Sequence, residues 1–179
     1  MADDQIAVVA DLVDGIRDLG LAPVLVGGMA LVILGSRRVT DDYDFVVSRP
    51  GDQLERIVDL FYDRGFELAS RVNDAGDVTA TIDNRRVACA RLRIDEPASA
   101  YFFNVTTRLR VDLLFDFPVP AAALAERATR LTIRAHVIEI ASPADLLHLK
   151  ELARSARSVA GDAQDLEFLR SYLAGKGGS

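Results

Sequence analysis

The feature that most constrains the fold is a short apolar strand that runs into a glycine pair, with an acid-bearing strand soon afterwards. Residues 24–26 (Val-Leu-Val) have the composition of a buried strand, and Gly27-Gly28 follows it directly. Residues 42–48 (Asp-Tyr-Asp-Phe-Val-Val-Ser) predict a second strand. Because side chains alternate along a strand, Asp42 and Asp44 project from one face and the apolar residues from the other. The second strand therefore has a core face and an acidic face.

The acidic face needs a positive partner. Two carboxylates a few ångströms apart repel each other unless a cation or an arginine lies between them. Mg²⁺ prefers oxygen ligands, commonly one or two carboxylates together with substrate phosphates. Gly27-Gly28 follows a strand and opens a helix, which leaves backbone N–H groups accessible to a phosphate. A nucleoside triphosphate site explains both features; the alternative is a solvated strand whose acids pair with Arg37 or Arg38.

The rest of the chain predicts an α+β fold, with a mixed sheet towards the N-terminus and two helices at the C-terminus. Apolar spacing and capping residues indicate helices over 4–19, 29–34, 53–64, 118–126, 143–157 and 162–174. Segments bounded by turn residues predict strands over 66–70, 78–82, 87–94 and 102–115, and a hairpin over 131–140.

Composition argues against several classes of protein. The chain has 179 residues, half of them hydrophobic, which suits one compact unit. Its longest apolar stretch is far shorter than the roughly 20 residues that a membrane span needs, and its acidic start lacks the basic residues of a secretory signal. The single cysteine, Cys89, cannot form an internal disulfide, so a cytoplasmic location is expected. The net charge of −6 argues against nucleic-acid binding through the overall field.

The stretch VGGMALVILGSRRVTDDYDF, residues 26–45, resembles the signature of the DNA polymerase β-like nucleotidyltransferase superfamily. More narrowly, it is similar to the AbiEii-type toxin branch of type IV toxin–antitoxin systems, whose pattern is Gly-Gly-x-Ala and then Gly-x-x-Arg-x-Thr-x-Asp-x-Asp. The positions that match are Gly27, Gly28, Ala30, Gly35, Arg38, Thr40, Asp42 and Asp44. The resemblance implies a nucleotidyltransferase fold, with a mixed, twisted sheet flanked by helices. We expect a catalytic core over 1–140, a helical pair packed on it over 141–175 and a flexible tail over 176–179.

The resemblance also implies a third carboxylate on a later strand. In TRLRVDLLFDF, residues 107–117, Asp112 lies within an apolar strand and is the better candidate. Asp116 is the alternative, although its place at the end of the strand is typical of a turn aspartate. By alternation, Arg108, Arg110 and Asp112 share one face. The two arginines either contact the substrate or are simply solvated.

The C-terminal helices resemble the same branch more loosely. The branch carries a lysine, an arginine and then a Lys/Arg-Asp-x-x-Asp stretch. The corresponding residues are Lys150, Arg154 and Arg157, then Asp162 and Asp165, with Gly161 where a basic residue is usual. Lys150 is expected to bind nucleotide phosphate. A solvated helix face and a helix N-cap explain the other residues equally well.

The resemblance implies metal-dependent transfer of a nucleotide from an NTP to a hydroxyl group. Asp42, Asp44 and Asp112 are expected to be catalytic and to hold two Mg²⁺ ions, with Mn²⁺ as a substitute. The residues expected to bind nucleotide phosphates are Gly27, Gly28, Arg38, Thr40, Lys150 and Arg154, although Arg38 and Thr40 can instead be structural.

Four alternatives remain open for the biological role. The expected one is a toxin-like enzyme that acts on the 3′ end of tRNA and has a cognate antitoxin, with a local arginine stripe to bind RNA despite the acidic charge. The second is an antitoxin-like enzyme that nucleotidylates a partner protein. The third is an aminoglycoside-type enzyme that acts on a small molecule. The fourth is an inactive module that binds nucleotide or a partner, against which the retention of three mutually repelling acids argues.

Overall fold

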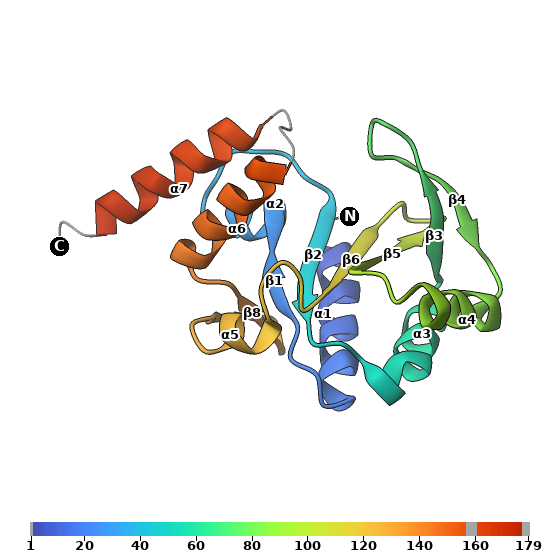
Figure 1. Ribbon diagram of the computed structural model, residues 1–179. Helices are drawn as coiled ribbons and strands as arrows, with labels where there is room; N and C mark the ends of the chain where they lie inside the picture. Colours follow the sequence, from blue (N-terminus) through green and yellow to red (C-terminus); the bar gives the residue numbers. More distant parts are fainter. Residues whose placement is uncertain (1, 157–160, 177–179) are drawn as a thin grey trace.

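The computed structural model describes residues 2–156 and 161–176. Within these residues, the centre of the protein is an eight-stranded sheet with the order β4-β3-β5-β6-β2-β1-β8-β7 (Figure 1). The strands are β1 (Val24–Val26), β2 (Asp42–Val47), β3 (Phe66–Val72), β4 (Val78–Ile82), β5 (Ser99–Asn104), β6 (Arg110–Phe115), β7 (Thr129–Ile133) and β8 (His136–Ile140). β2 is parallel to β6 and β1 is parallel to β8, while the other neighbours are antiparallel. The sheet is therefore mixed, as the sequence predicts.

Seven helices accompany the sheet in the described residues. They are α1 (Ala2–Asp18), α2 (Gly27–Ile33), α3 (Leu54–Tyr62), α4 (Arg85–Asp95), α5 (Ala121–Ala125), α6 (Pro143–Ala156) and α7 (Asp162–Lys176), with a 3₁₀ turn η1 (Gly51–Gln53) before α3. Figure 1 shows α6 and α7 packed together on one side of the molecule, with α3 and α4 on the other. No described helix has both the length and the apolar character needed to cross a membrane.

The apolar face predicted for α3 is the face that the core buries. Its buried residues are Leu54, Ile57, Val58 and Phe61. The Phe61 ring stacks on Phe102 of β5 with centroids 4.0 Å apart, and it meets Phe66 of β3 edge-on at 5.7 Å. Aromatic pairs in these arrangements stabilise a core beyond the area they bury. This cluster fixes α3 against β3 and β5, and so supports the strand next to β6.

Residues 87–94 belong to helix α4, so the strand predicted there is wrong. The side chain of Asn84 accepts hydrogen bonds from two backbone N–H groups of the first turn, which caps the helix. Ala88, Cys89 and Leu92 are buried, and this spacing is helical rather than alternating. Asn84 precedes the segment predicted as a strand, and its capping role accounts for the helix that forms there instead.

Residues 102–115 form parts of two antiparallel strands rather than one. The chain reverses after β5, where the side chain of Asn104 accepts hydrogen bonds from two backbone N–H groups of the turn. Arg108 lies in this turn, with a φ of +60°. The predicted face shared by two arginines and an aspartate is therefore reduced to Arg110 and Asp112, which do lie on one strand.

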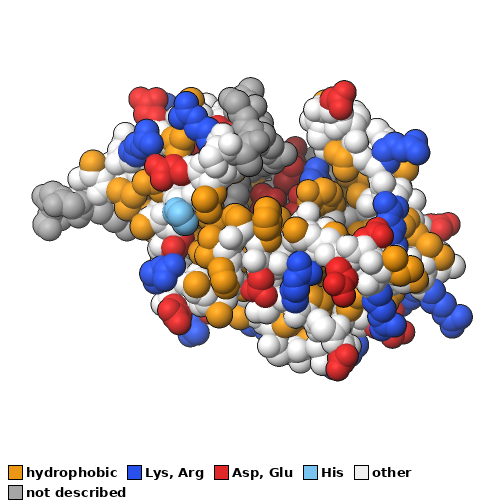
Figure 2. Space-filling model, viewed as in Figure 1, with side chains coloured by type: hydrophobic (Ala, Val, Ile, Leu, Met, Phe, Trp, Pro, Cys, Tyr) orange, Lys and Arg blue, Asp and Glu red, His pale blue; other side chains and the backbone are white. Residues whose placement is uncertain are grey.

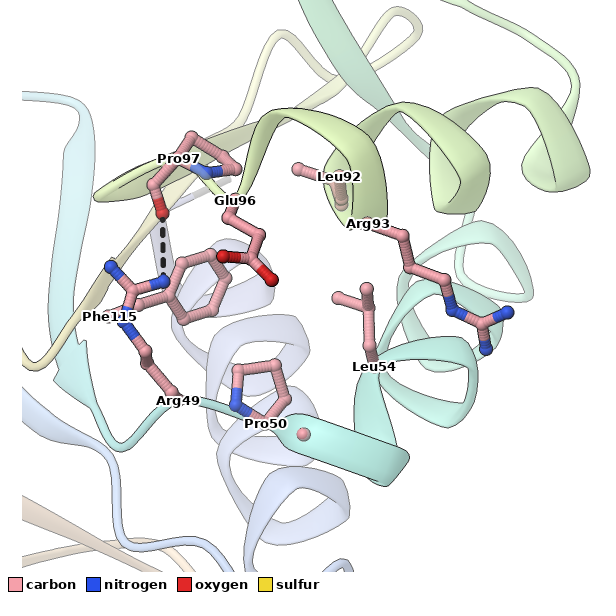
Figure 3. Close-up of a pocket in the computed structure, with 9 residues that line it drawn as sticks. Arg49, Pro50, Leu54, Leu92, Arg93, Glu96, Pro97 and Phe115 are labelled. Atoms are coloured by element: carbon pink, nitrogen blue, oxygen red, sulfur yellow. Dashed lines mark hydrogen bonds between the residues drawn. The ribbon is translucent and has the colours of Figure 1, made fainter.

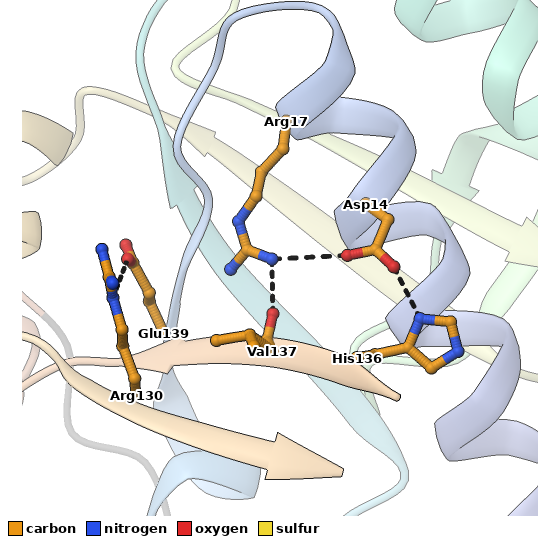
Figure 4. A network of polar contacts seen from close by, with 6 residues as sticks. All are labelled: Asp14, Arg17, Arg130, His136, Val137 and Glu139. Atoms are coloured by element: carbon orange, nitrogen blue, oxygen red, sulfur yellow. Dashed lines mark hydrogen bonds and ion pairs between the residues drawn. The ribbon is translucent and has the colours of Figure 1, made fainter. Parts of the chain in front are cut away.

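A polar network joins α1 to the β7–β8 hairpin (Figure 4). The Asp14 carboxylate lies 2.6 Å from Nδ1 of His136 and 3.4 Å from Nη1 of Arg17. The same Arg17 nitrogen donates a hydrogen bond to the carbonyl oxygen of Val137 at 2.5 Å. Because β8 pairs with β1, this network holds in place the strand that leads into Gly27.

Candidate active site

The three predicted carboxylates lie where β2 and β6 begin. The two strands pair in parallel, with Asp42 opposite Arg110 and Asp44 opposite Asp112. Residues opposite each other on neighbouring strands present their side chains to the same face. Tyr43 is buried on the other face of β2, as the alternation predicts. The fold thus brings together Asp44 and Asp112, which are 68 positions apart in the sequence (112 − 44).

The surface of the protein is hollowed on the side where β2 and β6 begin. Figure 2 shows a depression between the lobe formed by α6 and α7 and the β3–β4 hairpin, with acidic side chains at its floor. Strands β2 and β6 both begin at this end of the sheet (Figure 1). The geometry is that of a site with a negatively charged floor and two walls from distant parts of the chain.

The two glycines allow close contacts that other residues would block. Gly27 has a φ of +68°, and a Cβ atom there would lie 2.1 Å from Oδ2 of Asp44. A Cβ atom on Gly28 would lie 2.8 Å from Cζ of Arg38. The start of α2 therefore has room for one carboxylate and one guanidinium only because both positions lack a side chain.

Burial raises the pKa of two of these carboxyl groups. The pKa of Asp44 rises to about 6, chiefly because burial disfavours the charged form and then because of the nearby charge of Asp42. The pKa of Asp112 rises to about 7, again chiefly through burial, although hydrogen bonds from Arg110 oppose the rise. A cation that binds near these two carboxyl groups would favour their charged forms and lower their pKa values.

One cation is already supplied by the protein. Arg110 donates from Nε to Oδ1 and from Nη2 to Oδ2 of Asp112, both at 2.7 Å, which makes a bidentate pair. Its Nη1 donates to the carbonyl oxygen of Gly76, at the tip of the β3–β4 hairpin, at 3.0 Å. Its guanidinium also lies 4.5 Å from the centre of the Tyr101 ring. Arg110 is thus neither solvated nor free.

The donor atoms suit a hard divalent cation, but they do not form a ready metal cluster. In residues 2–156 and 161–176, no group of three or more His, Cys, Asp or Glu side chains is placed to hold a metal ion. Both carboxylate oxygens of Asp112 accept hydrogen bonds from Arg110. Carboxylate oxygens are the ligands that Mg²⁺ takes, and the pKa values of Asp44 and Asp112 are raised chiefly by burial, which a bound cation would oppose. The chemistry of the donors therefore fits Mg²⁺.

Two of the predicted phosphate-binding residues meet at a single buried acid. Nη1 of Arg38 lies 2.5 Å from Oδ2 of Asp165, and Nζ of Lys150 lies 2.8 Å from the same oxygen. Lys150 also lies 3.5 Å from Oδ1 of Asp162. Both cations lower the pKa of Asp44, although burial raises it by more. Arg38 and Lys150 therefore interact electrostatically with Asp44. Asp165 thus joins α7 to α6 and to the loop before β2.

The remaining predicted residues are less closely involved. Thr40 is half-buried in the loop that leads into β2, and Arg154 is exposed near the end of α6. Arg157 lies outside the described residues. Asp116, the alternative third carboxylate, accepts hydrogen bonds from the backbone N–H groups of Arg49 and Ala121, as expected of a turn aspartate.

A separate pocket of about 260 Å³ lies at the opposite end of β2 and β6 (Figure 3). Apolar Leu54, Leu92 and Phe115 line it together with the charged Arg49 and Glu96. None of the predicted site residues lines it. The acids are at the start of the strands and this pocket is beyond their ends, so the two are distinct features.

Solved structures with a similar fold include a nucleotidyltransferase-like protein, an antibiotic adenylyltransferase and an antibiotic-resistance factor. An antigenic nucleotidyltransferase-like protein from Paracoccidioides brasiliensis superposes with a TM-score of 0.61 at 16% identity, over 96% of this chain and 76% of that one. The lincosamide antibiotic adenylyltransferase LnuA, with lincomycin bound, gives 0.58 at 11% identity over 94% and 96%. The antibiotic-resistance factor ANT(2'')-Ia gives 0.58 at 11% identity over 97% and 86%. This chain has a nucleotidyltransferase-like fold.

The sequence matches no protein-family profile and no curated protein. At the identities found, structural likeness concerns the fold, so any statement about chemistry depends on the residues of this chain. The fold agrees with the superfamily resemblance of residues 26–45. The narrower resemblance to AbiEii-type toxins stays a prediction.

Two features of the site were not foreseen from the sequence. Arg110 was expected either to contact substrate or to be solvated, and its fork to Asp112 was not considered. The signal was present, because residues two apart on a strand share a face. The role of Asp165 as the common partner of Arg38 and Lys150 had no local signal, since the three residues come from three separate segments.

Proposed function

We propose that this protein is a Mg²⁺-dependent nucleotidyltransferase that transfers a nucleoside monophosphate from an NTP to an acceptor hydroxyl. The observation that carries the proposal is the register of β2 and β6, which sets Asp44 beside Asp112. Asp42 lies two residues before Asp44 on β2 and so on the same face of the strand. Three carboxylates at one end of a sheet repel each other, so their placement together is favourable only when a cation binds among them.

Asp42 and Asp44 would hold a pair of divalent ions, and Asp112 would be the third ligand. Bound divalent ions of this kind lower the pKa of an attacking hydroxyl and offset charge on the phosphates. Mn²⁺ can replace Mg²⁺ because the ligands are oxygen atoms. The nucleotide is therefore expected to bind over the acidic floor and only together with cations.

The basic residues around the floor would position the triphosphate. Gly27 and Gly28 would help bind the phosphates by letting the Asp44 carboxylate and the Arg38 guanidinium pack against the start of α2, which brings a metal ligand and a cation to the same place. Arg38 and Lys150 would offset phosphate charge, and Asp165 holds both side chains in place before the nucleotide arrives. Such preorganisation lowers the cost of fixing flexible side chains during binding. Thr40 and Arg154 are weaker candidates for the same role.

The acceptor that follows from the AbiEii resemblance is the 3′ end of a tRNA, in a toxin-like enzyme with a cognate antitoxin. A second candidate is a small molecule with a hydroxyl group. It is supported by the use of this fold in LnuA, whose structure contains lincomycin, and in ANT(2'')-Ia, whose structure contains adenylyl-2''-tobramycin. The net charge of −6 also suits a small cationic acceptor better than a polyanion.

Transfer of label from α-labelled NTPs tests the proposal directly. The protein is incubated with Mg²⁺ and with tRNA, candidate partner proteins, an aminoglycoside or a lincosamide, and the labelled product identifies the acceptor. Asp44→Asn and Asp112→Asn should reduce product to the background level. Asp41→Asn is the matched control, because Asp41 is an exposed neighbour outside the proposed ligand set, and it should retain the wild-type rate. Wild-type transfer in both Asp44→Asn and Asp112→Asn would show that the assignment is wrong.

Two further readouts separate the roles. A toxin predicts growth arrest when the wild-type chain is expressed and normal growth with Asp44→Asn. An inactive binding module predicts that NTPs raise the Tm of the protein while no acceptor is labelled.

A further inference from the structure

Arg110 makes a set of contacts that a simple structural ion pair does not need. Its three guanidinium nitrogens reach two places at once, namely both oxygens of Asp112 and the carbonyl oxygen of Gly76. The Arg110 side chain is 15% exposed and that of Asp112 is 6% exposed, so water competes little for these bonds. The Tyr101 ring lies against the guanidinium and favours a flat orientation.

The charge of Arg110 also reaches the other two acids of the floor. Asp42 lies opposite Arg110 across the β2–β6 ladder. Asp42, Asp44 and Asp112 all favour the charged form of Arg110. Arg110 is therefore paired with one of the three carboxylates and electrostatically favoured by the other two, in the region where a divalent ion would bind.

We propose that Arg110 is a resident cation of the metal site, so that a divalent ion gains Asp112 only when Arg110 leaves it, and that this departure releases the tip of the β3–β4 hairpin. The inference rests on the proposed function, because it takes Asp112 as a metal ligand. Arg110 is then a positioning residue that keeps the acids together without metal and links metal binding to the hairpin wall of the hollow.

The physical basis is competition for one carboxylate. A bidentate guanidinium uses both oxygens of Asp112 in the plane of the group. A cation that binds the same oxygens must displace at least one of these hydrogen bonds. Since Nη1 of the same group holds Gly76, a guanidinium that moves away from Asp112 weakens the contact with the hairpin as well.

A purely structural role makes the opposite prediction for metal affinity. Loss of a nearby positive charge strengthens cation binding in either case, so the charge-conserving variant Arg110→Lys separates the two roles. If Arg110 only holds Asp112 in position, loss of the fork in Arg110→Lys leaves the acid misplaced and weakens metal binding or leaves it unchanged. If the fork competes with the metal, Arg110→Lys strengthens binding.

The test measures Mn²⁺ binding to the full chain by calorimetry and by electron paramagnetic resonance, at about pH 8 so that protons compete little for the acids. Arg110→Gln should bind Mn²⁺ about tenfold or more tightly than wild type, because charge-assisted hydrogen bonds no longer oppose the ion. Arg110→Lys, which keeps the charge but cannot form the fork, should lie between the two. Arg108→Gln is the matched control from the adjacent turn and should bind as wild type does.

Hydrogen exchange of the wild-type protein tests the same idea without a substitution. Saturating Mn²⁺ should speed amide exchange in residues 73–77, at the hairpin tip, and leave residues 54–62 of α3 unchanged. Equal or weaker Mn²⁺ binding in Arg110→Lys would overturn the inference, and so would unchanged exchange of residues 73–77. If Arg110→Lys does not fold, the exchange measurement alone decides.

The outcome for Asp112→Asn distinguishes the two proposals. If Asp112→Asn weakens Mn²⁺ binding and Arg110→Lys fails to strengthen it, the metal site stands and only the inference about Arg110 falls. If Asp44→Asn and Asp112→Asn both bind Mn²⁺ as tightly as wild type, the metal site itself is wrong and both proposals fall.

Discussion

An alanine at Gly27 tests whether the glycine is needed for the site or only for the turn. At a φ of +68°, an alanine costs about 1–2 kcal/mol because its backbone is left-handed. Its Cβ would also lie 2.1 Å from Oδ2 and 2.9 Å from Cγ of Asp44, so the carboxylate or the start of α2 must move. Overpacking of this kind costs a further amount of about 1–3 kcal/mol.

Gly20→Ala is the matched control. Gly20 has a φ of +81°, and no atom lies within 4 Å of the position that its Cβ would take. It should therefore show the backbone cost of about 1–2 kcal/mol and nothing more. The difference in free energy of unfolding between the two variants isolates the clash with Asp44.

Urea unfolding followed by circular dichroism gives that difference, and labelled-NTP transfer gives its functional effect. For a chain of this size, each kcal/mol should lower the Tm by about 2–4 °C. Transfer should fall by about 100-fold in Gly27→Ala, because a small displacement of a reacting group has an effect of this size. It should remain at the wild-type rate in Gly20→Ala. Equal free energies of unfolding, or normal transfer by Gly27→Ala, would refute the reasoning.

Two further predictions concern the charges of the site. Because the folded-state pKa values of Asp44 (about 6) and Asp112 (about 7) exceed the ordinary value of 3.8, the folded state binds more protons than the unfolded state between about pH 4 and 7. The metal-free protein should therefore lose stability as the pH rises through this window, and urea unfolding in EDTA at several pH values should show the loss flattened in the double variant Asp44→Asn/Asp112→Asn. Asp165→Asn should lower the free energy of unfolding by about 1–3 kcal/mol and raise the KM for NTP, because Arg38 and Lys150 lose a charged hydrogen-bond partner. Glu151→Gln, which removes an exposed ion pair with Arg170, should change the stability by less than about 1 kcal/mol.

Hydrophobic periodicity within a segment predicted several strands and helices correctly. The alternation of residues 42–48 gave the acidic and apolar faces of β2, and the helical spacing in 53–64 gave the buried face of α3. The hairpin predicted over 131–140 is present as β7 and β8. Where a side chain redirected the backbone, the prediction failed. Asn84 caps a helix and Asn104 closes a turn, and neither role is evident from hydrophobicity alone.

The candidate site was predictable only in part, for a related reason. Side chains alternate between the two faces of a strand, so the sequence alone predicts that Asp42 and Asp44 share one face. Asp112 required the resemblance, because a single acid in an apolar strand does not reveal which strand lies beside it. The contact between Arg110 and Gly76 and the meeting of Arg38 and Lys150 at Asp165 depend on how distant segments pack. No periodicity in the sequence encodes such contacts.

The register of β2 against β6 links the stability of the core to the geometry of the site. Val111 and Leu113 are buried on one face of β6, while Arg110 and Asp112 share the other. A slip of one residue would exchange these faces and place an aspartate in the core, where an unpaired charge is costly. The apolar face therefore holds Asp112 beside Asp44, even though burial and repulsion raise the pKa of both. The core thus imposes an arrangement that is unfavourable for the acids themselves, and Arg110 offsets that cost when no other cation is bound.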